Sequence, residues 1–212
     1  MKKRKSPRPP APAPSPRAGF TLFEVLIVLA LIGVLVLLGM PAMMNSLNRA
    51  KLSGFAQQTA TAMQAARLEA IKRSTPARVE VHFADNSVIA YVDLDANNLY
   101  TPGTDVLVFQ ARAPAGVMLE GPAAGGSPAN TNAVSGFAAI GGGGVALFNS
   151  DGSVKTVGGF RFRDQRGNIM EAFVSPQASA RIAVRKYAGD PNGTDDPAKY
   201  FEADESPGWT WN

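Results

Sequence analysis

The chain of 212 residues contains no cysteine and only one histidine, His82. Without cysteine the protein has no disulfide framework, no thiol nucleophile and no cysteine-ligated zinc. A single histidine also excludes most histidine metal sites and most triads that use a histidine base. No set of nucleophile, base and acid can be assembled from the sequence, so we expect neither an enzyme nor a bound cofactor.

Acidic residues are absent from the first 19 positions, which hold six of the 21 lysines and arginines and six prolines. After Gly19 the chain has 15 basic and 17 acidic side chains, so the net charge of +4 and the pI of about 9.5 reflect the N-terminus. The charge is therefore no argument for nucleic-acid binding. A basic cluster before an apolar run instead indicates the cytoplasmic flank of a membrane helix.

An apolar run extends over residues 20–44 and contains one charged residue, Glu24. About 20 helical residues cross a hydrocarbon core of about 30 Å, so this run predicts a transmembrane helix. Helix-forming residues continue from Asn45 to Ser74. The helix is expected to end at Thr75-Pro76, because a residue before proline is pushed out of the α region. We expect one long helix over residues 20–75. Its second half carries an apolar stripe formed by Leu52, Phe55, Thr59, Met63, Ala66 and Ala70.

Short runs with a period of two follow Pro76 and predict strands. They lie at residues 79–83, 88–92, 106–109, 145–148, 154–162, 169–174 and 181–187. Residues 116–144, rich in glycine, alanine and proline, predict a long mobile loop with at most one short strand, near residues 137–140. The acidic segment 189–212 is expected to be a flexible tail. The predicted fold class is α+β, with the long helix packed on an antiparallel β head of residues 76–188.

Glu24 lies five residues into the membrane helix, where an acidic side chain costs about 2.5–3.5 kcal/mol. Cleavage after Gly19 would create a partner for it, the α-amine of a new Phe20. In a filament of parallel, staggered helices, the amine of one subunit can meet Glu24 of its neighbour. This pairing would neutralise both groups and fix the axial register.

The string Arg17-Ala18-Gly19-Phe20-Thr21-Leu22-Phe23-Glu24 resembles the class III signal of type IV prepilins and type II secretion pseudopilins. The resemblance implies that a prepilin peptidase cuts after Gly19 and methylates Phe20, and that Glu24 is the assembly glutamate. Leader residues 1–19 would then be removed. Pro41 occupies a position where many pilins carry a helix-loosening proline, and it predicts a kink or a local helix break. A harmless membrane proline is the alternative.

Three further segments, residues 65–73, 148–152 and 179–185, resemble GspH/FimT minor pseudopilins. In the members of that family that take up DNA, a C-terminal motif reads roughly Gly-Arg-x-Arg. Here Ala180 replaces the glycine and Ala183 replaces the second arginine. Arg181 and Arg185 remain as possible DNA contacts, but the departure from the motif favours a chain that does not bind nucleic acid.

Two weaker patterns leave alternatives open. Asp93, Asp95 and Asn97 place oxygen atoms at alternate positions, as at the start of a calcium loop, but the later glycine and glutamate of such a loop are missing. A turn without an ion is the preferred interpretation. Six basic residues predict a solvated sheet face, with phosphate binding as the alternative. They are Arg161, Arg163, Arg166, Arg181, Arg185 and Lys186.

The sequence thus predicts a minor pseudopilin of a type II secretion system, anchored by one helix in the inner membrane with its head in the periplasm. Its expected partners are other pseudopilins or pilins in a helical filament, the prepilin peptidase and the membrane. The alternative is a minor pilin of a type IV pilus that primes assembly or binds DNA. A membrane-anchored enzyme is a third class, which the missing catalytic residues disfavour.

Overall fold

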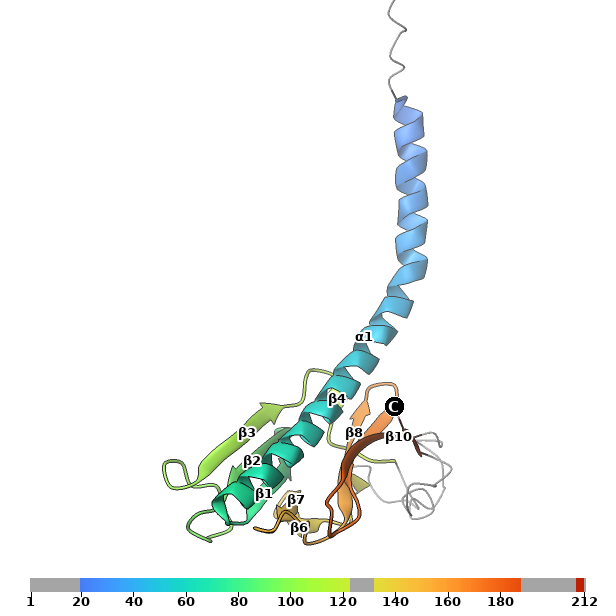
Figure 1. Cartoon of the computed structure of the whole chain (residues 1–212). Coiled ribbons are helices and arrows are strands. Elements are labelled where there is room, and N and C mark those ends of the chain that lie inside the picture. The colour runs from blue at the N-terminus through green and yellow to red at the C-terminus, as the bar shows by residue number, and fades with distance from the viewer. Residues whose placement is uncertain (1–19, 123–131, 188–208, 212) are drawn as a thin grey trace, which may run out of the picture. The chain divides into compact units, whose positions relative to one another are not determined.

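The computed structural model describes residues 20–122, 132–187 and 209–211. The predicted leader with Gly19, the middle of the predicted loop 116–144 and most of the predicted tail lie outside these residues. The chain divides into two compact units, Met1–Met43 and Met44–Asn212. Helix α1 (Leu22–Arg73) contributes to both units (Figure 1).

In the first unit, α1 is apolar on all sides and its side chains are exposed, with Leu22 at 81% and Leu37 at 74% of their full accessibility. Among the described residues, α1 is the one helix whose length and composition would allow it to cross a membrane. A helix that is apolar all round is stable only when something apolar covers it. This part of α1 is therefore the candidate membrane anchor, and the chain is a candidate single-pass membrane protein.

Helix α1 continues through Pro41 without interruption. This continuity agrees with the single long helix expected from the sequence. Proline removes one intrahelical hydrogen bond, and the remaining bonds on either side are sufficient to continue the helix. A loosening of α1 at Pro41 within a filament stays a prediction.

At its other end α1 stops two residues before the predicted boundary at residue 75. Ser74 adopts a positive φ of 51°, and its amide donates to the carbonyl of Ile71 at 3.2 Å. The amide of Thr75 donates to the carbonyl of Ala70 at the same distance. These bonds satisfy carbonyls that the last helical turn would otherwise leave unpaired, and Pro76 then starts the path to the first strand.

The second unit contains two antiparallel sheets beside the C-terminal part of α1. The five-stranded sheet has the order β3-β2-β1-β7-β6. Its strands are β1 (Ala77–His82), β2 (Ser87–Val92), β3 (Val106–Arg112), β6 (Ala138–Ile140) and β7 (Gly143–Phe148). The second sheet has the order β11-β10-β9-β8-β4, and β5 also pairs with β8. Its strands are β4 (Val117–Met118), β5 (Val134–Ser135), β8 (Gly158–Asp164), β9 (Ile169–Val174), β10 (Ile182–Tyr187) and β11 (Trp209–Trp211).

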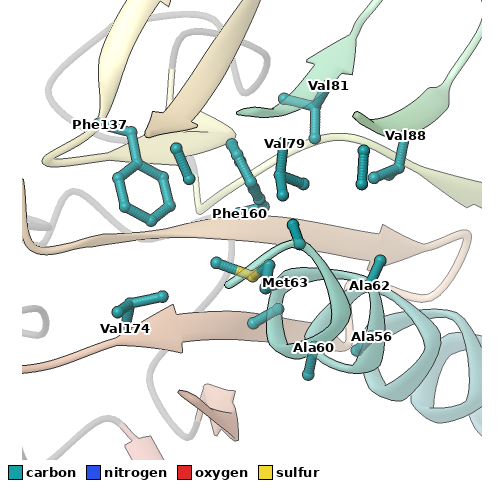
Figure 2. Close-up of a cluster of buried hydrophobic side chains, with 14 of the residues drawn as sticks. Ala56, Ala60, Ala62, Met63, Val79, Val81, Val88, Phe137, Phe160 and Val174 are labelled. Atoms are coloured by element: carbon teal, nitrogen blue, oxygen red, sulfur yellow. The ribbon is translucent and has the colours of Figure 1, made fainter. Parts of the chain in front are cut away.

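One hydrophobic core joins α1 to both sheets. All six residues of the predicted stripe, Leu52 to Ala70, are buried in the core or beside it. The buried cluster drawn in Figure 2 includes small helix residues such as Ala56 and Ala60 together with Val79 of the first sheet and Phe160 of the second. Such small side chains let the helix backbone approach the sheets closely. The predicted α+β fold class, a long N-terminal helix on antiparallel sheets, is confirmed.

The short strand predicted near residues 137–140 is present as β6. The limit to one strand in residues 116–144 is wrong, because the described part of this segment also contains β4, β5 and the start of β7. The glycines that suggested a loop instead permit close strand contact. A Cβ atom on Gly143 would collide with the carbonyl oxygen of Val81 on the neighbouring strand β1. The segment lacks side chains with a two-residue period, and its strands form through backbone pairing.

The predicted flexible tail also needs a correction at its C-terminal end. Trp209–Trp211 form strand β11, which pairs antiparallel with β10 at the edge of the second sheet. The sequence did not indicate this strand, because three residues are too few to show a period. The other residues of the predicted tail, up to residue 208, lie outside the described part of the chain.

Candidate functional site

The first candidate site is the N-terminal end of α1. Thr21 caps the helix: its hydroxyl accepts a hydrogen bond from the amide of Glu24 at 3.2 Å. This is the normal arrangement of a threonine N-cap, and an acid in the first turn also suits the positive end of the helix dipole. This hydrogen bond uses the backbone amide of Glu24, so the side-chain carboxylate of Glu24 remains available to another partner.

The carboxylate of Glu24 lies among apolar side chains. Glu24 borders a shallow hollow on the helix surface, and the other lining residues are Phe20, Val25, Val28 and Leu29. Phe20, the first described residue, is 85% exposed. An ionised acid in such apolar surroundings needs a cation or hydrogen-bond donors once lipid or another helix excludes water. The surface therefore presents one negative charge in an apolar patch that can be covered. Gly19 lies outside the described residues.

The second candidate site contains two arginines of the second sheet, Arg161 and Arg185, which fit neither the solvated face nor the phosphate site expected from the sequence. Arg185 is only 2% exposed, and its Nη2 donates to Oε2 of Glu171 at 2.7 Å. Its guanidinium also lies over the ring of Phe173, 3.5 Å from the centroid. Arg185 is therefore neither on a solvated face nor accessible to a nucleic-acid phosphate. Of the two arginines predicted as possible DNA contacts, only Arg181 is exposed.

Glu171 is the centre of a buried ion network that the sequence analysis missed. Strand pairing places Arg161 on β8 and Arg185 on β10 directly opposite Glu171 on β9. Nε of Arg161 and the hydroxyl of Ser135 donate to Oε1 of Glu171 at 3.0 and 2.9 Å. Glu171 is fully buried. Its presence within the otherwise apolar strand 169–174 was the available signal, because a buried acid requires cationic partners.

The surroundings of this network explain why Arg161 is also buried. Its Nη1 donates to the carbonyl of Asn132 at 2.7 Å, so the segment before β5 covers the guanidinium. Burial is the largest effect on this group and lowers the pKa of Arg161 to about 10, while the nearby Glu171 opposes that change. A Cβ atom on Gly159 would lie 2.6 Å from Cδ of Glu171, so a glycine is needed beside the carboxylate. The network is a structural element of the sheet.

The third candidate site is the loop between β2 and β3. The structure brings Asp93 and Asp95 together with Asp105, and one carboxylate oxygen from each lies within 4.8 Å of the others. Asn97, named with the two aspartates in the alternative calcium interpretation, turns its side chain toward its neighbours. Its Nδ2 donates to Asp95 and Thr101, and its Oδ1 accepts from the amide of Leu99. Asp105 was missed because ten residues separate it from Asp95.

Comparisons with known proteins agree with this geometry. A family model described as "Type II transport protein GspH" matches residues 56–186, which include the C-terminal part of α1 from Ala56 onward and most of the two sheets. A second model, "Prokaryotic N-terminal methylation motif", matches residues 14–40. A "Pilin-like protein PilA1" from Thermus thermophilus is 40% identical over 91 residues, covering 42% of this chain and 56% of the relative. The chain thus spans little more than half the length of that relative.

No solved structure matches the chain. The sequence similarities and the fold nevertheless agree on each part of the molecule. The methylation motif coincides with the exposed apolar start of α1, and the GspH match covers more than half of the chain. The family is pilin-like and structural, and its members assemble with other pilins into filaments. The chain has both parts of such a protein, and it belongs to the GspH family of pilin-like proteins.

Proposed function

We propose that this protein is a minor pseudopilin of a type II secretion system, a structural subunit of the short filament that drives protein secretion across the outer membrane. The observation that carries the proposal is the match of the head to a family described as a type II transport protein. The exposed apolar part of α1, with Glu24 near its start, supplies a surface for packing against other subunits. No catalytic step is required of the chain itself.

The proposed topology has the basic leader in the cytoplasm, α1 across the inner membrane and the head in the periplasm. The positive charge of residues 1–19 favours this orientation. In the assembled filament, neighbouring helices replace lipid around the apolar part of α1. A prepilin peptidase would cut between Gly19 and Phe20 and methylate the new N-terminus, and Glu24 would then pair with the amine of a neighbouring subunit.

The first prediction concerns processing. In cells with an active prepilin peptidase, the intact mass of the membrane-bound protein should correspond to loss of residues 1–19 and gain of one methyl group. Changing Gly19→Val should block cleavage, because a branched side chain occupies the position before the cut bond. Gly33→Ala is the matched control, since a Cβ atom at Gly33 meets nothing within 4 Å. A full-length wild-type chain in such cells would contradict the assignment.

A minor pilin of a type IV pilus is the second candidate function, because the similar protein from Thermus thermophilus is described as pilin-like. Such a protein would prime pilus assembly or bind DNA during uptake. The burial of Arg185 by Glu171 disfavours DNA binding, since a phosphate cannot reach that guanidinium without breaking the network. Of the two motif arginines, only the exposed Arg181 is left to contact a phosphate.

The second prediction separates these two functions. Deleting the gene from its host should strongly reduce the amount of exoprotein in the medium and leave DNA uptake unchanged. Exoprotein is measured by quantitative proteomics of the medium, and uptake by transformation frequency. Re-expression of the wild-type chain and of an Arg181→Ala variant should both restore secretion. Normal secretion combined with a loss of transformation would instead favour the type IV pilus.

A further inference from the structure

The acidic cluster of Asp93, Asp95 and Asp105 lies where β2 enters the loop to β3 and where that loop leads into β3 (Figure 1). Asp93 directly follows β2 and Asp105 directly precedes β3. Both side chains are buried, with 7% and 8% of their accessibility left, and Asp95 is exposed. Two carboxylates of the cluster, those of Asp93 and Asp105, are therefore buried next to the strand ends, and the third, that of Asp95, lies on the solvent side.

A buried oxygen atom in this cluster has no hydrogen-bond partner. Oδ2 of Asp93 accepts from the amide of Asn98 at 2.9 Å, but Oδ1 of Asp93 is buried without any partner among the described residues. An unpaired buried carboxylate oxygen is costly, because it has lost its water and gained nothing in exchange. Such an atom beside two further carboxylates indicates a missing positive charge.

No basic side chain of the described residues pairs with this cluster. Within the described residues, no lysine or arginine lies within ion-pair distance of Asp93, Asp95 or Asp105. Arg78 comes near through the loop but bonds elsewhere: its Nε donates to Glu80 at 3.0 Å and its Nη1 to Asn98 at 2.8 Å. Three carboxylates at this spacing repel one another, and a divalent cation between them would remove the repulsion.

The remaining hydrogen bonds hold the carboxylates in place without using up their oxygen atoms. Oδ1 and Oδ2 of Asp105 accept from the amides of Leu94 and Thr101 at 2.9 and 2.7 Å. Oδ1 of Asp95 accepts from the amide of Asn97 at 3.2 Å. A carboxylate oxygen has more than one lone-pair direction, so each can accept an N–H and still bind a cation. These hydrogen bonds hold the loop in place at both ends and keep the three carboxylates close together.

We propose that Asp93, Asp95 and Asp105 form a calcium site that fixes the β2–β3 loop of the head. An all-oxygen set suits a hard cation, and two oxygen atoms on opposite sides of Ca²⁺ are about 4.8 Å apart. The oxygens of the cluster meet that limit. Magnesium binds at about 2.0–2.1 Å in a strict octahedron and keeps its waters, so calcium fits the irregular loop better. The proposal does not depend on which filament the protein joins.

The third prediction tests this site on the full chain in detergent after removal of divalent metals with EDTA. Titration calorimetry with CaCl₂ should show one Ca²⁺ per chain with a dissociation constant of about 10⁻⁴–10⁻³ M, the range of weak extracellular sites. The melting temperature should rise by about 3–5 °C in 10 mM CaCl₂. MgCl₂ at the same concentration should give a clearly smaller rise.

Variants connect the binding to the named residues. Asp95→Asn should weaken Ca²⁺ binding at least about tenfold. It keeps an oxygen for the amide of Asn97 and changes an exposed residue, so folding should be intact by circular dichroism. Asp93→Asn should have the same effect on binding. The matched control is Asp85→Asn, at the opposite end of β2, which should bind Ca²⁺ like the wild type.

Three results would each overturn the proposal. One is no heat and no change in melting temperature for the wild type up to 10 mM CaCl₂. Another is Ca²⁺ binding by Asp95→Asn that equals that of the wild type. The third is an equal response to MgCl₂, which would replace calcium by a general divalent site.

Discussion

Replacing Glu171→Ala is expected to reduce the free energy of unfolding of the head by about 3–5 kcal/mol, the usual effect of removing one partner from a buried ion pair. The alanine leaves two buried guanidinium groups, of Arg161 and Arg185, facing each other across β9 without their shared anion. Total stabilities of domains are about 5–15 kcal/mol, so this loss would leave the head marginally folded. Urea unfolding of the full chain in detergent, followed by circular dichroism, measures it.

Two further variants test whether the guanidinium charges left without Glu171 cause this loss of stability. Glu69→Ala is the matched control on α1, because Glu69 also bonds two cations, Lys72 and Arg73, but on the exposed helix surface. Its effect should be close to the error of measurement, as expected for surface ion pairs. A triple apolar replacement of Arg161, Glu171 and Arg185 should recover most of the stability that Glu171→Ala loses. A loss of less than about 1 kcal/mol for Glu171→Ala would contradict the argument.

The fold was predictable where apolar side chains carry a helical period or form a continuous run. The stripe on α1 was confirmed, because burial of one helix face imposes a spacing of three to four. The strands near residues 79–83, 88–92 and 169–174 were also confirmed, and they are buried along nearly their whole length rather than on one face. The short strands β4, β5 and β11 were not predictable. They are held by backbone pairing to a neighbour, and two or three residues are too few to display a period.

The sites were predictable only where neighbours in sequence carry the chemistry. The motif from Gly19 to Glu24 is contiguous, so its resemblance to prepilin signals could be recognised and agrees with the methylation-motif match. The Glu171 network joins three strands, and the acidic cluster joins Asp93 to Asp105 across a loop. A strand register is needed before such residues can be brought together. Arg161 on β8 and Arg185 on β10 were therefore wrongly assigned to a solvated face.

The largest functional effect is expected at Glu24. A Glu24→Ala chain should still insert and be cleaved, since the change removes a charge from lipid. Its incorporation into filaments should fall at least about tenfold, because the amine of the neighbouring subunit would be left unpaired in an apolar interface. The chain contains no cysteine, so Gln57→Cys on exposed helix surface can carry one photo-crosslinker. Cross-linked neighbours in membranes of complemented cells are then counted by immunoblot.

Charge and helix capping can be separated at this site. Glu24→Gln keeps the size of the side chain and the amide that donates to Thr21, and loses only the negative charge. It should fail to incorporate, as Glu24→Ala does. Thr21→Ala removes the hydroxyl that accepts from the amide of Glu24 and leaves the carboxylate in place, so it should incorporate nearly as well as the wild type. If Glu24→Gln cross-links like the wild type while Thr21→Ala does not, the glutamate acts by capping its own helix, and the pairing between subunits is wrong.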